Sequence, residues 1–249
     1  QSFVSGSKFG LSAYGDLVAN KAFQLAVGNT LLLTALTVPL LLAVSLAVAL
    51  LVRRYARSGA LLLHAFVINY AIPTASIAYV WMLLYEDFGF VNTWLNQLAG
   101  IPPRNWLDSA LLYVPIISLF LAKYAAYPIL LFLGGLQALP SDLYEAADMD
   151  GATGFQKFRY LTLPLLVPEL LFVAVLGFFF NFKVYKEAYA LFGSYPPKSI
   201  YLVQHFMNNH FQKLNLDLLT ASATVMTVVI GTLIYLLIRL NRRAYFESQ

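Results

Sequence analysis

Ionisable and aromatic side chains inside long apolar runs are the residues of this sequence that could do chemistry. Lys123 lies in the middle of SLFLAKYAAYPILLF, with Tyr124 beside it and Tyr127 one helical turn further on. A charge inside a membrane span is costly and by default marks a cavity or a partner. Aromatic rings can stack on sugar faces while their hydroxyl groups hydrogen-bond. Three roles are open for Lys123: it faces a cavity or binds substrate, it pairs with a carboxylate of another chain, or it snorkels to the interface.

Other polar residues form weaker patterns. His205 and His210 are five residues apart, which is a poor spacing for joint ligation from one helix face, so we expect no metal site. The run Asp148-Met149-Asp150-Gly151 lacks the remaining ligand positions of a calcium loop. Three charged residues follow the fourth apolar run, and we expect them at an outer mouth or at a contact with a partner protein: Lys183, Lys186 and Glu187.

The sequence contains no recognisable catalytic set. It has no cysteine, which excludes disulfides, thiolate metal sites and cysteine nucleophiles. It also has no G-x-S-G nucleophile motif, no H-E-x-x-H motif and no intramembrane pair of aspartates. A membrane-embedded enzyme is therefore disfavoured. Because no G-x-x-x-x-G-K-[ST] loop occurs, we expect no cofactor in this chain, and any ATP and Mg²⁺ would be bound by a partner.

Composition indicates an integral membrane protein. Of the 249 residues, 60% are hydrophobic and 11% are charged, whereas a soluble domain is about 45–50% apolar and about 25% charged. This excludes an ordinary soluble enzyme, a disordered chain and a nucleic-acid-binding domain. Because the apolar runs lack the strict alternation of apolar and polar residues that a membrane β-barrel requires, they predict helices. We expect these helices to form a single domain, 1–249. Five runs are long enough to cross a bilayer: about 24–52, 60–85, 110–136, 164–182 and 218–239.

The connections between these runs predict an orientation. The clusters RRYAR, at residues 53–57, and RLNRR, at 239–243, favour a cytoplasmic position for the segments that carry them. The loop 86–108 and residue 1 then lie outside. A chain that begins outside normally needs an upstream span to deliver its N-terminus, so we expect a further N-terminal helix in the natural protein.

The cytoplasmic loop 140–163 is the most informative connection. It predicts two short helices with a hinge between them. Ser141 can cap the first helix, Gly151 can adopt a left-handed conformation after it, and the second helix runs from about Phe155 to Pro164. An amphipathic connector lying on the lipid headgroups is the alternative interpretation.

The segment EAADMDGATGFQKFRYLTLP, residues 145–164, resembles the EAA loop of permease subunits of bacterial ABC importers. That pattern is Glu-Ala-Ala, three residues, Gly, nine residues, Ile, one residue, Leu-Pro. The chain matches it in register, with Leu161 in place of Ile. The similarity to sugar-type permeases, the maltose- and glycerol-phosphate-like subgroup, extends over three further segments: 9–34, 88–92 and 178–223. One departure from that subgroup is Gly193-Ser194-Tyr195-Pro196-Pro197, where sugar permeases often carry Gly-Gly-Pro.

The resemblance implies an all-α integral membrane fold, the helical bundle of a type I ABC importer permease, with five of six helices present. It implies that the loop docks into a cytoplasmic ATPase through six residues: Glu145, Ala146, Ala147, Asp150, Gly151 and Pro164. It also places five residues along the substrate pathway: Lys123, Tyr124, Tyr127, Gly177 and Asn181.

The function so implied is a multi-pass subunit of an ATP-driven importer in the bacterial inner membrane. The expected partners are an ATPase dimer, a second permease subunit, an extracellular solute-binding protein and the lipid bilayer, but no nucleic acid. The expected substrate is an oligosaccharide or a related carbohydrate, which would be anionic if Lys123 faces the cavity. A permease for a non-sugar solute and, less favoured, a secondary transporter are the alternatives; the sequence shows no internal repeat of the kind many secondary transporters have.

Overall fold

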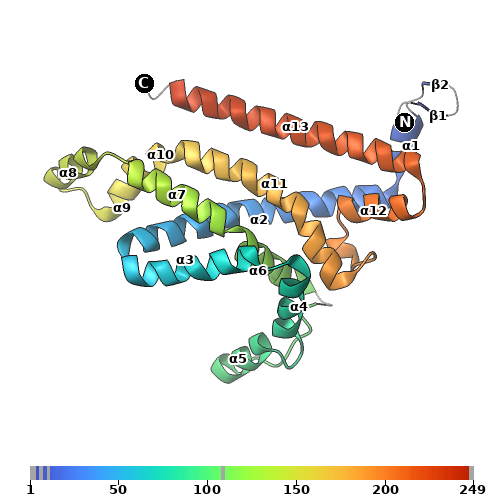
Figure 1. The fold of residues 1–249 in the computed structure, drawn as a ribbon, viewed down its shortest axis with the longest axis horizontal. Coiled ribbons are helices and arrows are strands. Elements are labelled where there is room, and N and C mark those ends of the chain that lie inside the picture. Colours follow the sequence, from blue (N-terminus) through green and yellow to red (C-terminus); the bar gives the residue numbers. More distant parts are fainter. Residues whose placement is uncertain (1–3, 6–7, 10–11, 108–109, 247–249) are drawn as a thin grey trace.

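The computed structural model describes residues 4–5, 8–9, 12–107 and 110–246. Apart from two short paired strands, β1 (Val4–Ser5) and β2 (Lys8–Phe9), the described chain is helical. Helices that run along the long axis of the molecule form a bundle, and the helices at its two ends connect them (Figure 1).

The first long helix, α2 (Lys21–Arg54), follows the short α1 (Ser12–Ala19). It begins at Asn20, whose side-chain oxygen accepts hydrogen bonds from the backbone N–H groups of Ala22 at 2.9 Å and Phe23 at 3.3 Å. With 34 residues it is about 50 Å long at 1.5 Å per residue. It therefore covers the span expected at 24–52 and extends beyond it at both ends.

Two expected spans are broken rather than continuous. The run 60–85 forms α3 (Ala56–Ala71) and α4 (Thr74–Tyr85), and α5 (Phe90–Ala99) follows; the segments Gly59–Ala71 and Thr74–Ala99 are bent by 117°. Pro73 lies at the break, where it lacks an N–H donor and forces the preceding residue out of the helical region.

The second broken span lies in the run 110–136. After a short 3₁₀ turn (Ala110–Leu112), it forms α6 (Tyr113–Tyr124) and α7 (Ala126–Ala138), which are bent by 52°. Pro128 cannot donate a hydrogen bond to the carbonyl of Tyr124, which accounts for the break at Ala125.

The remaining long helices are α11 (Val167–Phe192) and α13 (Leu216–Phe246). Between them lie a 3₁₀ turn (Lys198–Ile200) and α12 (Val203–Gln212). In the described residues, three helices are long and apolar enough to cross a membrane, and the two bent pairs raise that number to as many as five. This agrees with the five spans expected from sequence. The α11 helix, however, continues ten residues beyond the expected end at 182. The prediction ended the span at the first charged residue, but a charged residue ends an apolar run without ending a helix.

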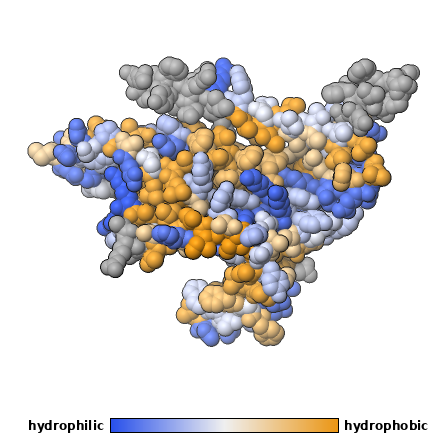
Figure 2. Space-filling view, viewed as in Figure 1, coloured by the Kyte–Doolittle hydropathy of each residue, from blue (hydrophilic) through white to orange (hydrophobic). Residues whose placement is uncertain are grey.

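The core lies where α2, α7 and α11 pack together. Leu41, Phe132 and Val173 are among its fully buried side chains. Gly135 lets α7 approach α11 closely, because a Cβ atom at that position would lie 2.8 Å from the side chain of Glu169. Apolar side chains cover much of the middle of the face shown in Figure 2, and polar side chains gather towards its two ends and on the part that projects below.

Candidate functional site

The candidate coupling loop forms one end of the molecule, where α8 (Ser141–Met149) and α9 (Gly154–Lys157) extend beyond the bundle (Figure 1). The prediction that Ser141 caps the first helix of the loop is wrong. Pro140 occupies the cap position without a side-chain hydrogen bond, and the Ser141 hydroxyl donates to the Asp142 carboxylate instead, at 3.2 Å. A proline fits this position because its fixed φ suits the extended residue that precedes a helix.

The turn after α8 confirms the expected left-handed glycine. Gly151 has a φ of +73°. The backbone N–H of Gly151 donates to the carbonyl of Asp148 at 3.1 Å, and that of Ala152 donates to the carbonyl of Ala147 at 2.9 Å. These bonds satisfy carbonyls at the end of α8. A residue with a Cβ atom would be strained here by its backbone alone, since no atom lies within 4 Å of the added Cβ.

The second half of the loop is not the single helix expected from about Phe155 to Pro164. A capping box starts α9: the Thr153 hydroxyl accepts from the Gln156 N–H at 3.3 Å, and the Gln156 side chain accepts from the Thr153 N–H at 2.7 Å. A π-helical turn (Phe158–Thr162) and the short α10 (Leu163–Leu165) then lead into α11. Pro164 lies in the first turn of α10, where a missing N–H is tolerated.

One side of α8 is tied to the rest of the chain. The Tyr144 hydroxyl hydrogen-bonds with the Thr162 hydroxyl at 2.8 Å, and Lys157 forms an ion pair with Asp148 at 2.5 Å. The guanidinium of Arg53, at the end of α2, lies 5.7 Å from the centre of the Tyr144 ring. The helix is therefore held against the ends of α2 and α10.

The other side of α8 is open. Glu145 and Ala146 are exposed, and Met149 is 90% exposed. A hollow of about 370 Å³ lies beside the turn, and residues from both halves of the loop line it: Ala147, Asp150, Gly151, Ala152, Gln156, Lys157, Tyr160 and Leu161. The arrangement offers a partner a short helix with small side chains, exposed apolar residues and an adjoining hollow.

The residues expected along a substrate pathway do not lie in one cavity. Tyr127 is 45% exposed on α7, whereas Asn181 is buried and donates a hydrogen bond to the Thr37 hydroxyl of α2. Gly177 packs against α2, where an added Cβ would lie 3.3 Å from the side chains of Val38 and Leu41. Gly177 and Asn181 therefore both contact residues of α2, whereas the Tyr127 side chain is accessible on α7.

Lys123 and Tyr124 belong to a buried polar cluster that the sequence did not reveal. The Lys123 ammonium donates to the Ile72 carbonyl at 2.5 Å, and the Tyr124 hydroxyl donates to Glu187 at 2.8 Å. Thr74 also donates to Glu187, at 3.3 Å. Glu187 is only 1% exposed, so the prediction that it lies at an outer mouth is wrong. Part of a signal was available, since Pro73 and Lys123 each interrupt an apolar run.

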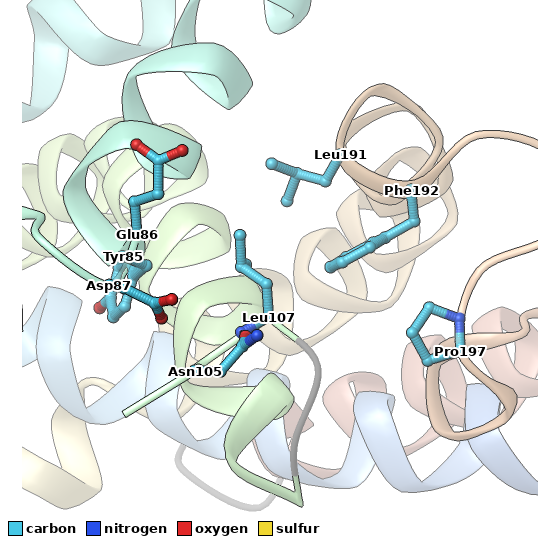
Figure 3. Close-up of a pocket in the computed structure, with 8 residues that line it drawn as sticks. All are labelled: Tyr85, Glu86, Asp87, Asn105, Leu107, Leu191, Phe192 and Pro197. Atoms are coloured by element: carbon cyan, nitrogen blue, oxygen red, sulfur yellow. The ribbon is translucent and has the colours of Figure 1, made fainter. Parts of the chain in front are cut away.

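Away from α8, a pocket of about 370 Å³ opens between two parts of the chain (Figure 3). One wall comes from the end of α4, with Tyr85, Glu86 and Asp87, and from Asn105 and Leu107 of the following loop; Leu191, Phe192 and Pro197 form the other wall. The loop is held by the buried Asn92, whose side chain hydrogen-bonds to Glu86, Arg104 and Trp106.

The two histidines that we discounted as a metal site lie in α12, outside the spans. Burial lowers the pKa of His205 to about 4, and its ring packs edge-on against Tyr185. Burial and the charge of Lys213 lower the pKa of His210. Within the part of the chain that the structure describes, no three potential metal-ligating side chains lie together.

Comparison with known proteins gives relatives of one kind. The chain is 32% identical over 189 residues to the trehalose/maltose transport system permease protein of Thermococcus litoralis, an alignment that covers 75% of this chain and 64% of the relative. It is also 32% identical over 200 residues to the arabinooligosaccharides transport system permease protein of Bacillus subtilis, covering 77% and 62%. The chain thus spans less than two thirds of the length of these relatives.

The fold matches a crystal structure of a bacterial ABC transporter involved in the import of the acidic polysaccharide alginate. The TM-score is 0.85 at 20% identity, and the match covers 97% of this chain and 86% of the other. The family model for binding-protein-dependent transport system inner membrane components matches residues 40–246, which include the coupling loop and every long helix after α2. The chain therefore belongs to the family of binding-protein-dependent transport system inner membrane components.

Proposed function

We propose that this chain is the membrane-spanning subunit of an ATP-driven importer for an oligosaccharide or a related carbohydrate. The observation that carries the proposal is the loop 140–163. Its first helix is exposed along one side, its turn requires the left-handed Gly151, and its sequence matches the EAA pattern in register. A connector lying on lipid headgroups would need neither this turn nor the hollow beside it.

The proposed mechanism transmits movement through this loop. Glu145 would meet a basic group of a cytoplasmic ATPase, Ala146 and Ala147 would allow close packing, and Asp150 and Gly151 would shape the turn. Closure of the ATPase dimer would then push on α8 and, through Pro164, on α11. Such a loop is a two-state element that nucleotide and substrate can both bias.

The ATPase subunits would bind ATP and Mg²⁺, and this chain would itself catalyse no reaction and hold no cofactor. A second, different permease subunit would complete the pathway, and an extracellular solute-binding protein would deliver the substrate. The protein would cross the bacterial inner membrane several times, with α8 on the cytoplasmic side. The basic residues Arg53, Arg54 and Lys157 near that end support this orientation.

The carbohydrate substrate is supported by the names of the two relatives, which are permeases for trehalose/maltose and arabinooligosaccharides. Tyr127 is the accessible aromatic residue among the proposed pathway residues and would offer a ring to a sugar face. Gly177 and Asn181 would join the pathway from α11. An anionic substrate has weaker support, because the Lys123 ammonium already donates to the Ile72 carbonyl.

Co-purification tests the proposal. The full-length protein, tagged and extracted in mild detergent from its native host, should bring down an ATPase, and Glu145→Arg should remove that ATPase. Asp16→Arg is the matched control, because Asp16 is an exposed acid on α1 at the other end of the bundle. A chain that purifies without an ATPase, or with one that is indifferent to Glu145→Arg, would contradict the proposal and favour a secondary transporter.

A further inference from the structure

The break between α3 and α4 exposes the backbone ends of two helices inside an apolar bundle. Ile72 has φ −70° and ψ 135°, so its carbonyl points out of the helical ladder, and α4 begins at Thr74. Such ends need hydrogen-bonding partners where water is scarce. The C-terminal end of α3 carries the negative end of a helix dipole, and the N-terminal end of α4 carries the positive end of another.

Buried charged side chains of opposite sign lie at these two ends. Lys123, in the last turn of α6, donates to the Ile72 carbonyl at the negative end of α3. Glu187 of α11 accepts from the Thr74 hydroxyl at the positive end of α4. Each charge therefore matches the dipole that it faces. Tyr124 adds a third contact by donating to Glu187 at 2.8 Å.

The break matters because it sets where the next helices lie. In the arm formed by α4 and α5, residues 74–99, the first half packs against α6 and α11 through the buried Ile77 and Ala78, and α5 extends away from the bundle (Figure 1). This arm carries Glu86 and Asp87, on one wall of the pocket in Figure 3, while α11 carries Leu191 and Phe192, on the opposite wall. Glu187 lies one helical turn before Leu191, so the cluster at the break joins the two walls.

We propose that Lys123 and Glu187 form a clamp that fixes the arm 74–99 against α11 and thereby sets the width of the pocket between them. Both are positioning residues. They act through the bend at Pro73, and neither needs to touch the solute. The proposal concerns this chain alone, so it can fail while the proposed transport function stands, and the reverse also holds.

Distances between spin labels test the clamp. These 249 residues contain no cysteine, so Ile68→Cys on α3 and Leu98→Cys on α5 would give two exposed labelling sites on either side of the bend once cysteines in the companion proteins and in any further part of the chain are replaced. The full-length protein would be purified with its companions into nanodiscs, without nucleotide or solute. The wild-type background should give one narrow distance distribution between the two labels.

Removing either charge should loosen the arm, because one helix end at the bend then loses the charged group that it faces. Lys123→Met and Glu187→Gln should each broaden the distribution or add a second maximum. Glu187→Gln is the cleaner variant, since it keeps an oxygen to accept from Tyr124 and Thr74. The double variant should broaden the distribution at least as much as either single variant does, because the two charges hold different helix ends. Lys183→Met is the matched control: this lysine lies one turn before Glu187 and over the rings of Phe179 and Phe180, so its loss should change nothing.

Unchanged distributions in both single variants would overturn the clamp. If the neutral variants cannot be purified, Lys123→Arg decides, because it keeps the charge at the Ile72 carbonyl. It should give the wild-type distribution, and a broadened one would count against the assignment.

Discussion

The left-handed turn at Gly151 allows the coupling loop to be tested by a single added methyl group. Gly151→Ala places a Cβ atom where no other atom lies within 4 Å, so the substitution causes no clash. The remaining cost is that of holding an L-residue at φ +73°, about 1–2 kcal/mol. A change of this size shifts the equilibrium between two arrangements of the loop by a factor of about 5–30.

We expect Gly151→Ala to lower the number of solute molecules transported per ATP hydrolysed, and Gly151→Val to lower it further. Gly151→Asn should be intermediate, because asparagine tolerates the left-handed region better. Gly154→Ala is the matched control. Gly154 lies three residues away, also has open space around its Cβ position, and adopts an ordinary helical conformation as the first residue of α9.

Proteoliposomes that contain the purified transporter allow transport and ATP hydrolysis to be measured in the same sample. The expected order of coupling is wild type and Gly154→Ala first, then Gly151→Asn, then Gly151→Ala, then Gly151→Val. Equal coupling in Gly151→Ala and wild type would refute the argument, because the strain would then not reach the ATPase. Equal loss in Gly154→Ala would refute it differently, by showing that any change in the loop is harmful.

Two other residues give separate tests. Tyr127→Ala should reduce uptake while the ATPase still co-purifies, because the half-exposed ring lies on α7, away from the loop. Tyr127→Phe keeps the ring and removes only the hydroxyl, so it separates their contributions to uptake. Unchanged uptake in Tyr127→Ala would remove the residue from the pathway. His205 predicts a pH dependence, because burial lowers its pKa from 6.5 to about 4. The neutral form is favoured in the folded state, so the stability of α12 should be complete above pH 6.5 and should fall as the pH drops towards 4, by at most about 3 kcal/mol. Hydrogen exchange of residues 203–212 against pH measures this loss, and His205→Phe should flatten the profile; an equally steep profile in that variant would assign the effect to another group.

The spans could be predicted from sequence because an uncharged run of some 20 residues has few alternatives to a membrane helix. The turn at Gly151 could be predicted for a similar reason, since a glycine placed after a capped helix favours a left-handed residue. Both signals are local. The exact cap was missed because Pro140 and Ser141 are each suited to the start of a helix, and only the backbone shows which of them precedes the first helical residue.

The buried cluster could not be predicted because its members are far apart in the chain. Ile72 and Lys123 are 51 residues apart, and Tyr124 and Glu187 are 63 residues apart. The sequence shows that Lys123 needs a partner but not which one. Its nearest acceptor is a backbone carbonyl, and no side-chain pattern reveals a carbonyl that Pro73 has released from its helix.

The positions of the two breaks relate the pocket to the coupling loop. Pro73 and Pro128 both lie beside the polar cluster in which Lys123 donates to Ile72 at the end of α3, and in which Tyr124 and Thr74 donate to Glu187 of α11. Below the breaks, α3 and α7 run back towards the end that carries α8; above them, α4 and α6 lead to the pocket. A continuous helix would transmit a push from α8 along its whole length. A broken one would pass that push on through side chains that pack across the break, so the charges of Lys123 and Glu187, together with the packing of Ile77 against Leu119 and Leu191, would influence how far a movement of the loop reaches.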